Sequence, residues 1–334
     1  MASLGKLKFV GLDFAPPGGG KSFNAQVAEG HRQDNPVERL RHLIELNFAH
    51  NYFGLVRFRC MGVEDIDKHA RRERRVVQPL SGKRKLTERA EYFLTEDFHI
   101  EEGIVPVEHI RAMRDDLYAE QRYWDPYKNL EMVGPPETLH EPMLYMYFER
   151  LFANPNFLKI IANQAMIDFC REALGPGAAL SWAWSWISNP GFHAYQNQNW
   201  HRDSAEPLNF LKVFIPLGPV QDEMDGPTVL IPRTSKFPNF VEKRRYTDME
   251  MSILQATNGV GMIPAEEGDI YFINTYALHK GMAPMRRRAI VTLLVSLSPS
   301  HRTPSMPRQK LKDVPEEARD VIAKNKRFFR YLVD

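Results

Sequence analysis

The sequence predicts a mainly β protein with flanking helices, in which the strands form an antiparallel sandwich or barrel of the jelly-roll kind. Residues 178–300 contain short apolar runs separated by turn residues, and no helical pattern of convincing length interrupts them. The segment AALSWAWSWISN alternates with period two, so Trp182, Trp184 and Trp186 share one face of a strand. The 24 prolines and 20 glycines of the chain also favour many turns and short strands.

Four further runs in this region have the apolar and β-branched composition of strands. They are LNFLKVFIPLGPV (208–220), GPTVLIP (226–232), GDIYFINTY (268–276) and RRAIVTLLVSLS (287–298). Parallel strands need long crossover connections, usually helical, and the region offers none. The runs are therefore expected to pair antiparallel.

Helices are predicted on both sides of the β region, because apolar residues there recur at helical spacing. The predicted helices are VERLRHLIELNFAHNYFGL (37–55), PVEHIRAMRDDLYAEQRYW (106–124), NPNFLKIIANQAMIDFCREALG (154–175) and VPEEARDVIAKNKRFFRYLV (314–333). The third of them ends at Gly175, where a glycine can cap the helix.

The beginning of the chain has a different character. Residues 1–36 read as an irregular arm, and residues 68–89 are densely basic. We interpret the basic segment as a solvated loop or helix face, with a patch for an anionic ligand as the alternative. The chain is therefore divided into an N-terminal extension of unknown role, residues 1–90, and a domain of strands and flanking helices, residues 91–334. The extension could serve as a lid or as the contact of a homo-oligomer.

Composition narrows the class of protein. The formal net charge is +2, from 44 basic and 42 acidic residues, so the chain as a whole offers no electrostatic case for binding nucleic acid. Cys60 and Cys170 are its two cysteines, which gives no disulfide framework and fits a reducing compartment. No run reaches the 18 apolar residues of a membrane span. The expectation is a cytoplasmic protein with neither a membrane span nor a nucleic-acid partner.

Two segments of the chain resemble motifs of nucleotide-binding enzymes, but the residues around them do not fit those motifs. The segment APPGGGKS (15–22) resembles a phosphate-binding loop, which needs a strand before it and a helix after it. The residues that follow it, FNAQVAEGH, are a poor helix start, two prolines stiffen the loop, and the α/β alternation of such a fold is missing. The tripeptide His-Arg-Asp in NWHRDSAEP (199–207) resembles a kinase catalytic loop. That loop needs an asparagine five residues after the aspartate, where this chain has Leu208. The kinase hypothesis is therefore rejected.

The same tripeptide suggests a metal site. On a strand, His201 and Asp203 point to the same side, since one residue separates them. His279 follows one predicted strand and precedes another, so a sheet could return it to this pair. Two histidines and one carboxylate form a facial triad that leaves coordination positions open, which suits non-haem Fe(II). The alternative for a His-x-Asp triplet is a surface histidine beside a turn aspartate.

Taken in order along the chain, these motifs resemble the phytanoyl-CoA dioxygenase family of Fe(II)/2-oxoglutarate oxygenases over roughly residues 95–300. The matching elements are Trp200-His201-Arg202-Asp203, the strand LKVFIPL, Asp225-Gly226-Pro227, LIPRTSK (230–236), Gly268-Asp269, His279 and Arg287-Arg288-Ala289. Their order and approximate spacing agree with the family. Two departures are Gly281, where a hydroxyl residue is frequent, and Arg-Thr-Ser in place of Gly-Ser-His.

The resemblance implies a double-stranded β-helix in which His201, Asp203 and His279 bind Fe(II), with 2-oxoglutarate and O₂ as co-substrates. It also implies an arginine that pairs with the far carboxylate of 2-oxoglutarate. That role is assigned to Arg287, two residues before Ala289. The alternatives, and the further candidates for cofactor binding, are Arg286, Arg288, Lys212 and Gln198.

The implied activity is oxidation of a small molecule, most simply its hydroxylation, while 2-oxoglutarate is decarboxylated to succinate and CO₂. Desaturation or rearrangement by the same oxidant is an alternative outcome, and specialised or lipid metabolism is the expected setting. The competing hypothesis is a catalytically silent β-barrel that binds a small molecule and keeps the fold. The intact triad favours the enzyme. The substrate itself is not specified by any motif.

Overall fold

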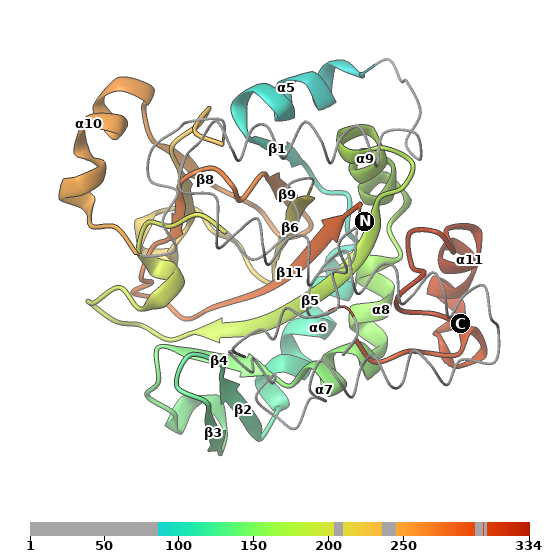
Figure 1. The fold of residues 1–334 in the computed structure, drawn as a ribbon. Helices are drawn as coiled ribbons and strands as arrows, with labels where there is room; N and C mark the ends of the chain where they lie inside the picture. The colour runs from blue at the N-terminus through green and yellow to red at the C-terminus, as the bar shows by residue number, and fades with distance from the viewer. Residues whose placement is uncertain (1–85, 204–209, 236–244, 298–302, 304–305) are drawn as a thin grey trace, which may run out of the picture.

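The computed structural model describes residues 86–203, 210–235, 245–297, 303 and 306–334. Within them two antiparallel sheets are flanked by helices (Figure 1). The larger sheet has the order β1–β9–β6–β11–β5–β4–β2–β3, and the smaller one the order β10–β7–β8. The larger sheet contains β1 (Phe98–Glu101), β2 (Arg122–Asp125), β3 (Leu130–Val133), β4 (Met143–Met146), β5 (Ala179–Ser188), β6 (Phe210–Pro216), β9 (Ile270–Ile273) and β11 (Arg288–Ser296). The smaller sheet contains β7 (Thr228–Leu230), β8 (Gly261–Ile263) and β10 (His279–Gly281).

The long strand β11 is the centre of the larger sheet. All nine of its residues are buried, because β5 and β6 pair with its two edges and both of its faces are covered. Its odd-numbered residues, such as Val291 and Leu293, belong to the core beneath the helices, whereas Ile290 belongs to a second core on the opposite face. The predicted strands over 178–189 and 287–298 are thus confirmed.

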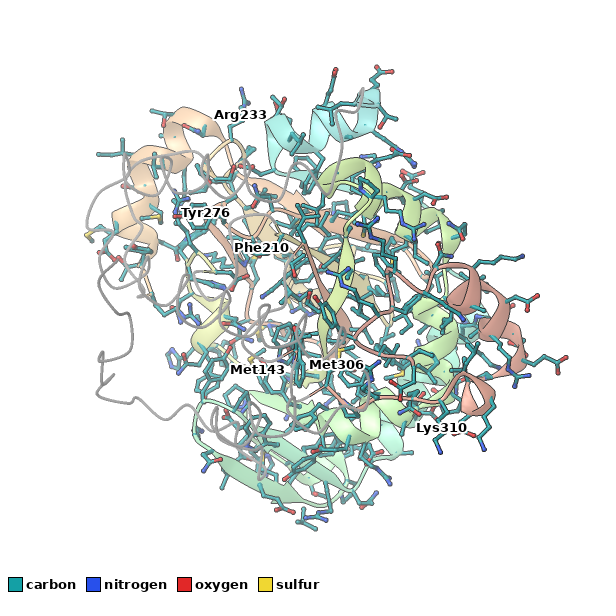
Figure 2. The ribbon with its side chains drawn as sticks, turned by 45° about the vertical axis from the view of Figure 1, so that its right-hand side comes forward. Met143, Phe210, Arg233, Tyr276, Met306 and Lys310 are labelled. Carbon is teal, nitrogen blue, oxygen red and sulfur yellow. The ribbon has the colours of Figure 1, made fainter. Side chains whose placement is uncertain are left out.

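Helices cover the outer face of the larger sheet. They are α5 (Glu88–Glu96), α6 (Val107–Ala119), α7 (Phe148–Ala153), α8 (Pro155–Ile161), α9 (Gln164–Leu174) and α11 (Glu316–Lys324). The remaining helix, α10 (Asp248–Asn258), lies at the opposite side of the molecule from α11 (Figure 1). Figure 2 shows the side chains that fill the interior, with Tyr276 toward α10 and Phe210 nearer the middle of the molecule.

Three predicted helices are shorter than expected. The helix over 106–124 ends at Ala119, and Arg122–Asp125 form the strand β2 instead, because this stretch pairs with β3 and β4. The helix over 154–175 is interrupted at Asn163, whose side chain accepts a hydrogen bond from the backbone N–H of Met166 and so starts a second helix. The last helix ends at Lys324, and turns replace its second half.

The smaller sheet continues past β10 through a short bridge. His201 pairs antiparallel with His279, which places the segment around His201 beside β10. The smaller sheet then has the order His201 segment, β10, β7 and β8, and it faces β9, β6, β11 and β5 of the larger sheet. This is the strand arrangement of the double-stranded β-helix. The predicted fold class, mainly β with flanking helices, is confirmed.

Some expectations fall outside the described residues. These are the arm, the helix over 37–55, the APPGGGKS segment and most of the basic segment. The division of the chain at residue 90 stays a prediction. In the part of the chain that the structure describes, no helix combines the length and apolarity needed to cross a membrane.

Phe169 tests the core between the helices and the larger sheet. Its ring is fully buried and lies 4.2 Å from the ring of Phe272 and 5.7 Å from that of Phe93, measured between centroids. We expect Phe169→Ala to lower the free energy of unfolding by about 3–5 kcal/mol, since it leaves a cavity. The matched control is Phe192→Ala, at a side chain that is 86% exposed, and it should change stability by less than about 0.5 kcal/mol. Chemical denaturation measures both, and equal effects would contradict this account of the core.

Candidate metal centre

The backbone brings His201, Asp203 and His279 together. The N–H of His201 donates to the carbonyl of His279 at 3.0 Å, and the N–H of His279 donates to the carbonyl of His201 at 3.1 Å. Asp203 continues the same edge, with its N–H donating to the carbonyl of Thr275 at 2.9 Å. Directly paired residues of antiparallel strands project to the same face. The two imidazole rings accordingly lie 4.2 Å apart between centroids.

The ligand atoms of the three side chains converge. His201 Nε2 lies 4.0 Å from Asp203 Oδ1, and His279 Nε2 lies 3.8 Å from Asp203 Oδ2. One ligand atom from each residue fits within 4.8 Å of the other two. In the described part of the chain this is the group of histidine, cysteine and acidic side chains able to hold a metal ion.

Hydrogen bonds orient the imidazoles for metal binding. His201 Nδ1 lies 2.8 Å from the carbonyl oxygen of Asn199, and His279 Nδ1 lies 2.9 Å from that of Ala277. A carbonyl oxygen can only accept, so Nδ1 carries the proton in both rings and Nε2 presents its lone pair toward Asp203. A hydrogen bond at the second ring nitrogen is the usual support of a metal-binding histidine.

Burial and charge keep the three groups in their ligand forms. Burial lowers the pKa of both His201 and His279, in His201 reinforced by the neighbouring imidazole, so both rings stay neutral. Burial by itself raises the pKa of Asp203, but the ammonium of Lys212 and the two imidazoles outweigh it and hold the pKa below its usual range. Metal ions bind deprotonated ligands, so the residues fit a divalent ion. Asp203 Oδ2 is buried, and its charged partner among the described residues is the ammonium of Lys212.

The lowered pKa values predict a pH dependence of stability. Below pH 6.5, the ordinary imidazole pKa, the unfolded chain takes up protons that the folded protein resists. The unfolded state then binds more protons, and the metal-free protein should lose stability as the pH falls, by at most about 1.4 kcal/mol per pH unit for each histidine. Urea denaturation from pH 7.5 to 5 should show this loss. A double variant, His201→Gln with His279→Gln, should lose less, and identical profiles would contradict the burial of these rings.

Lys212 lies against the triad. It stands on β6, and its Nζ forms an ion pair with Asp203 Oδ2 at 2.8 Å. The same Nζ lies over the ring of Trp184, 5.1 Å from the centroid. The side chain is 16% exposed, so it faces the interior and not solvent. This inward position keeps Lys212 among the candidates for binding an anionic ligand.

The three arginines before and within β11 point to different places. Arg286 is half exposed and pairs with Asp222 and Asp225. Arg287 Nε donates to Asn189 Oδ1 at 2.8 Å, and one of its terminal nitrogens donates to the carbonyl of Pro136. These partners belong to the connections after β5 and before β4, and neither of them is a residue of the triad.

Arg288 occupies the inner position instead. It is 8% exposed and donates to the carbonyl of Gly226. A Cβ atom placed on Gly281 would be 3.4 Å from its guanidinium. Gly281 follows His279 by two residues on β10, and so shares the face that carries the metal ligand. Arg288 Nε has no hydrogen-bond partner among the described residues. Arg288 is therefore a buried cation on the same side as the triad.

Gly226 explains part of the Asp-Gly-Pro motif. Its φ is +68°, and a Cβ atom there would lie 2.8 Å from the carbonyl oxygen of Met282 and 2.8 Å from Pro284 Cβ. Only glycine fits this close approach. The carbonyl that accepts from Arg288 is thus held by a backbone that no other residue could adopt without strain.

Gln198 is buried and stands shortly before His201 in the chain, but the oxygen of its side-chain amide already accepts a hydrogen bond. Gln198 Oε1 accepts a hydrogen bond from the backbone N–H of Tyr195 at 2.7 Å. This bond closes the short turn η4 (Gln196–Gln198), which precedes His201. A role for Gln198 in binding 2-oxoglutarate or substrate stays a prediction.

Comparison with known proteins places the chain by its fold. No protein-family model and no curated protein sequence matches it. Among solved structures, EctD from S. alaskensis in its apoform matches with a TM-score of 0.50 and 16% sequence identity, over 66% of this chain and 81% of EctD. HygX from Streptomyces hygroscopicus, with nickel, 2-oxoglutarate and hygromycin B bound, has a TM-score of 0.46 and 12% identity, over 64% of this chain and 87% of HygX. The chain has the fold of EctD.

Two buried threonines of the sheets were not singled out from the sequence. Thr292 stands between Trp184 and Phe214 in the larger sheet, and the hydroxyl of Thr228 contacts that of the buried Tyr271 at 2.9 Å. A threonine within a β-branched apolar run is common in any strand. The sequence therefore gave no signal that could distinguish these two hydroxyls from ordinary strand residues.

Proposed function

We propose that this protein is a non-haem Fe(II)- and 2-oxoglutarate-dependent oxygenase of the phytanoyl-CoA dioxygenase type, acting on a small molecule. The observation that carries the proposal is the triad of the buried His201 and His279 and the partly buried Asp203. Both Nδ1 atoms of the triad are bound to carbonyls, and both Nε2 atoms are turned toward one carboxylate. Two histidines and a carboxylate with open positions are the ligand set of such enzymes. The double-stranded β-helix supports the proposal, because His279 belongs to β10 of the smaller sheet and His201 pairs directly with it.

The residues of the site would have separate roles in binding the metal and the co-substrate. His201, Asp203 and His279 would hold Fe(II), which together with 2-oxoglutarate and O₂ supplies the oxidation of a C–H bond, most simply as hydroxylation. Arg288, and not Arg287, would bind the far carboxylate of 2-oxoglutarate, since its guanidinium lies against Gly281 on the metal-bearing strand. Its unused Nε–H and its planar fork suit a carboxylate.

The interior around the triad would protect the reaction from water. Trp186, Phe214, Tyr271 and Ile290 are buried on the inner face of the larger sheet and form one apolar cluster there. A dry site strengthens the attraction between charged groups. These side chains would thus favour the binding of the anionic co-substrate at Arg288 and limit unproductive oxidation.

The conversion of 2-oxoglutarate to succinate tests the proposal without knowledge of the substrate. Protein supplied with Fe(II), ascorbate, O₂ and 2-oxoglutarate should form succinate slowly, and an Asp203→Ala sample prepared in parallel should form none above background. Succinate is quantified by mass spectrometry. Wild-type protein that binds Fe(II) and forms no succinate, even with candidate substrates added, would favour the silent binding protein.

A further inference from the structure

Lys212 is a charged residue in an otherwise apolar strand. Its neighbours across the sheet are Leu294 on β11 and Ile273 on β9, and both are fully buried. Burying an ammonium group is costly unless a counter-ion accompanies it. Within the described residues, Lys212 forms its ion pair with Asp203. The lysine therefore depends on a carboxylate that the proposed function also assigns to the metal.

A site that held both Fe(II) and 2-oxoglutarate would leave one of its cationic side chains without a counter-ion. The two charges of Fe(II) are matched by the two carboxylates of 2-oxoglutarate. Asp203 can then match either Arg288 or Lys212, and no other acidic group of the described residues pairs with either of them. An uncompensated charge in a largely buried site attracts an anion strongly, because the local dielectric is low. The loaded site is thus expected to accept one more negative charge.

Two unpartnered polar atoms belong to residues that neighbour Trp184, the aromatic side chain beneath the Lys212 ammonium. Thr292 pairs directly with Trp184, whose ring lies under the Lys212 ammonium, and Trp182 contacts Trp184 with 6.2 Å between ring centroids. Thr292 Oγ1 and Trp182 Nε1 are buried and have no hydrogen-bond partner within the described chain. An indole N–H can only donate, and a hydroxyl can donate. Each of these donors would suit an oxygen acceptor, such as a carboxylate.

An apolar surface adjoins the same groups. Trp184 is only partly buried, whereas Trp182 and Trp186 on the same face are buried. Aromatic faces bind flat or apolar groups well. A ligand that carried its charge at Lys212 could therefore place its apolar part beside Trp184.

We propose that the substrate is a small carboxylate with an apolar body, whose carboxylate binds Lys212 and whose body packs beside Trp184. This inference rests on the proposed function, since it concerns the substrate of that site. It makes Lys212 a specificity-determining residue. The ammonium of Lys212 would bind the carboxylate of the substrate, while the guanidinium of Arg288 would bind the far carboxylate of 2-oxoglutarate.

The experiment compares matched carboxylates and amides. The probes are 3-phenylpropanoate, 4-phenylbutanoate and octanoate, each with its primary amide, which keeps the shape and removes the charge. Binding is measured by calorimetry on anaerobic protein loaded with Fe(II) and 2-oxoglutarate. We expect at least one carboxylate to bind about tenfold or more tightly than its amide, because hydrogen bonds to a charged group are stronger than neutral ones.

Variants assign the preference to Lys212. Lys212→Met should reduce the preference to about twofold or less, and Lys212→Arg should retain most of it. Lys280→Met is the control, because Lys280 has a similar environment outside the site, with Asp248 at 2.7 Å and the ring of Trp200 at 4.9 Å. It should leave the preference unchanged. Circular dichroism checks that each variant is folded.

Three results would overturn the inference. They are the absence of binding by every carboxylate, equal binding of carboxylates and amides, and a preference that survives in Lys212→Met. A variant that changes only the affinity for the metal or for 2-oxoglutarate would likewise show that Lys212 serves those groups alone. The visible absorption of the Fe(II)–2-oxoglutarate chelate, recorded on the same samples, separates this failure from failure of the proposed function. If the carboxylate preference appears without that absorption, the anion site stands and the oxygenase assignment falls.

Discussion

Alanine at Asp203 or at His279 is expected to lower the affinity for Fe(II) by at least about 100-fold and to abolish turnover. Loss of a group that merely supports a metal ligand typically costs 10–100-fold, so loss of a ligand should cost more. Each variant leaves two of three converging ligand atoms. Fe(II) binding is measured anaerobically by competition with a chromogenic chelator, and turnover by the formation of succinate.

The control is another histidine that pairs with a carboxylate. His99 Nε2 lies 2.9 Å from Glu101 on β1, away from the triad in the sheet order. His99→Gln should retain Fe(II) affinity within about threefold, since it removes no ligand. Undiminished activity of Asp203→Ala or His279→Ala at limiting Fe(II) would refute the assignment of the metal ligands.

The second large effect is expected at Arg288. Replacement of Arg288 by glutamine should raise the concentration of 2-oxoglutarate required for half-maximal rate by about tenfold to a hundredfold or more, because a paired set of charged hydrogen bonds is lost. Arg288→Lys should restore part of the affinity, since lysine keeps the charge without the planar fork. The rate of succinate formation at saturating Fe(II) gives the constant.

Arg287 provides the matched comparison one residue away. Its guanidinium already binds Asn189 and the carbonyl of Pro136, so Arg287→Gln should change the 2-oxoglutarate requirement by no more than about threefold. If Arg287→Gln raises the requirement and Arg288→Gln does not, the arginine of this site is the one that the sequence motif indicated. If neither variant responds, Lys212 becomes the remaining described cation near the triad.

The strand region and the converging triad could be predicted from sequence for a physical reason. The alternation of Trp182, Trp184 and Trp186 has the period of a strand, and one residue between His201 and Asp203 places both on one face. His279 could be added because it stands at a strand boundary, where chain return is common in antiparallel sheets. These inferences depend on the spacing of residues along a single strand, and the folded strand keeps that spacing.

The inner arginine could not be chosen in the same way. Every residue of β11 is buried, so the run RAIVTLLVS contains no alternation that distinguishes its two faces. The face of each residue is fixed by pairing with β5, in which Arg288 stands opposite Ser188. This register depends on contacts between segments about 100 residues apart. The end of α6 at Ala119 likewise depends on pairing with other segments, because the next stretch of chain forms β2 and pairs with β3 and β4. Local propensity does not contain that information.

The most direct test of the central claim is the absorption spectrum of the anaerobic protein with Fe(II) and 2-oxoglutarate. Chelation of Fe(II) by the keto-acid end of 2-oxoglutarate should produce a weak visible charge-transfer band that is absent with Fe(II) alone. We predict that wild-type protein shows the band, that His279→Ala lacks it, and that Arg288→Gln shows it only at higher 2-oxoglutarate concentration. A wild-type protein that binds Fe(II) but shows no band at saturating 2-oxoglutarate would contradict the assignment of this site.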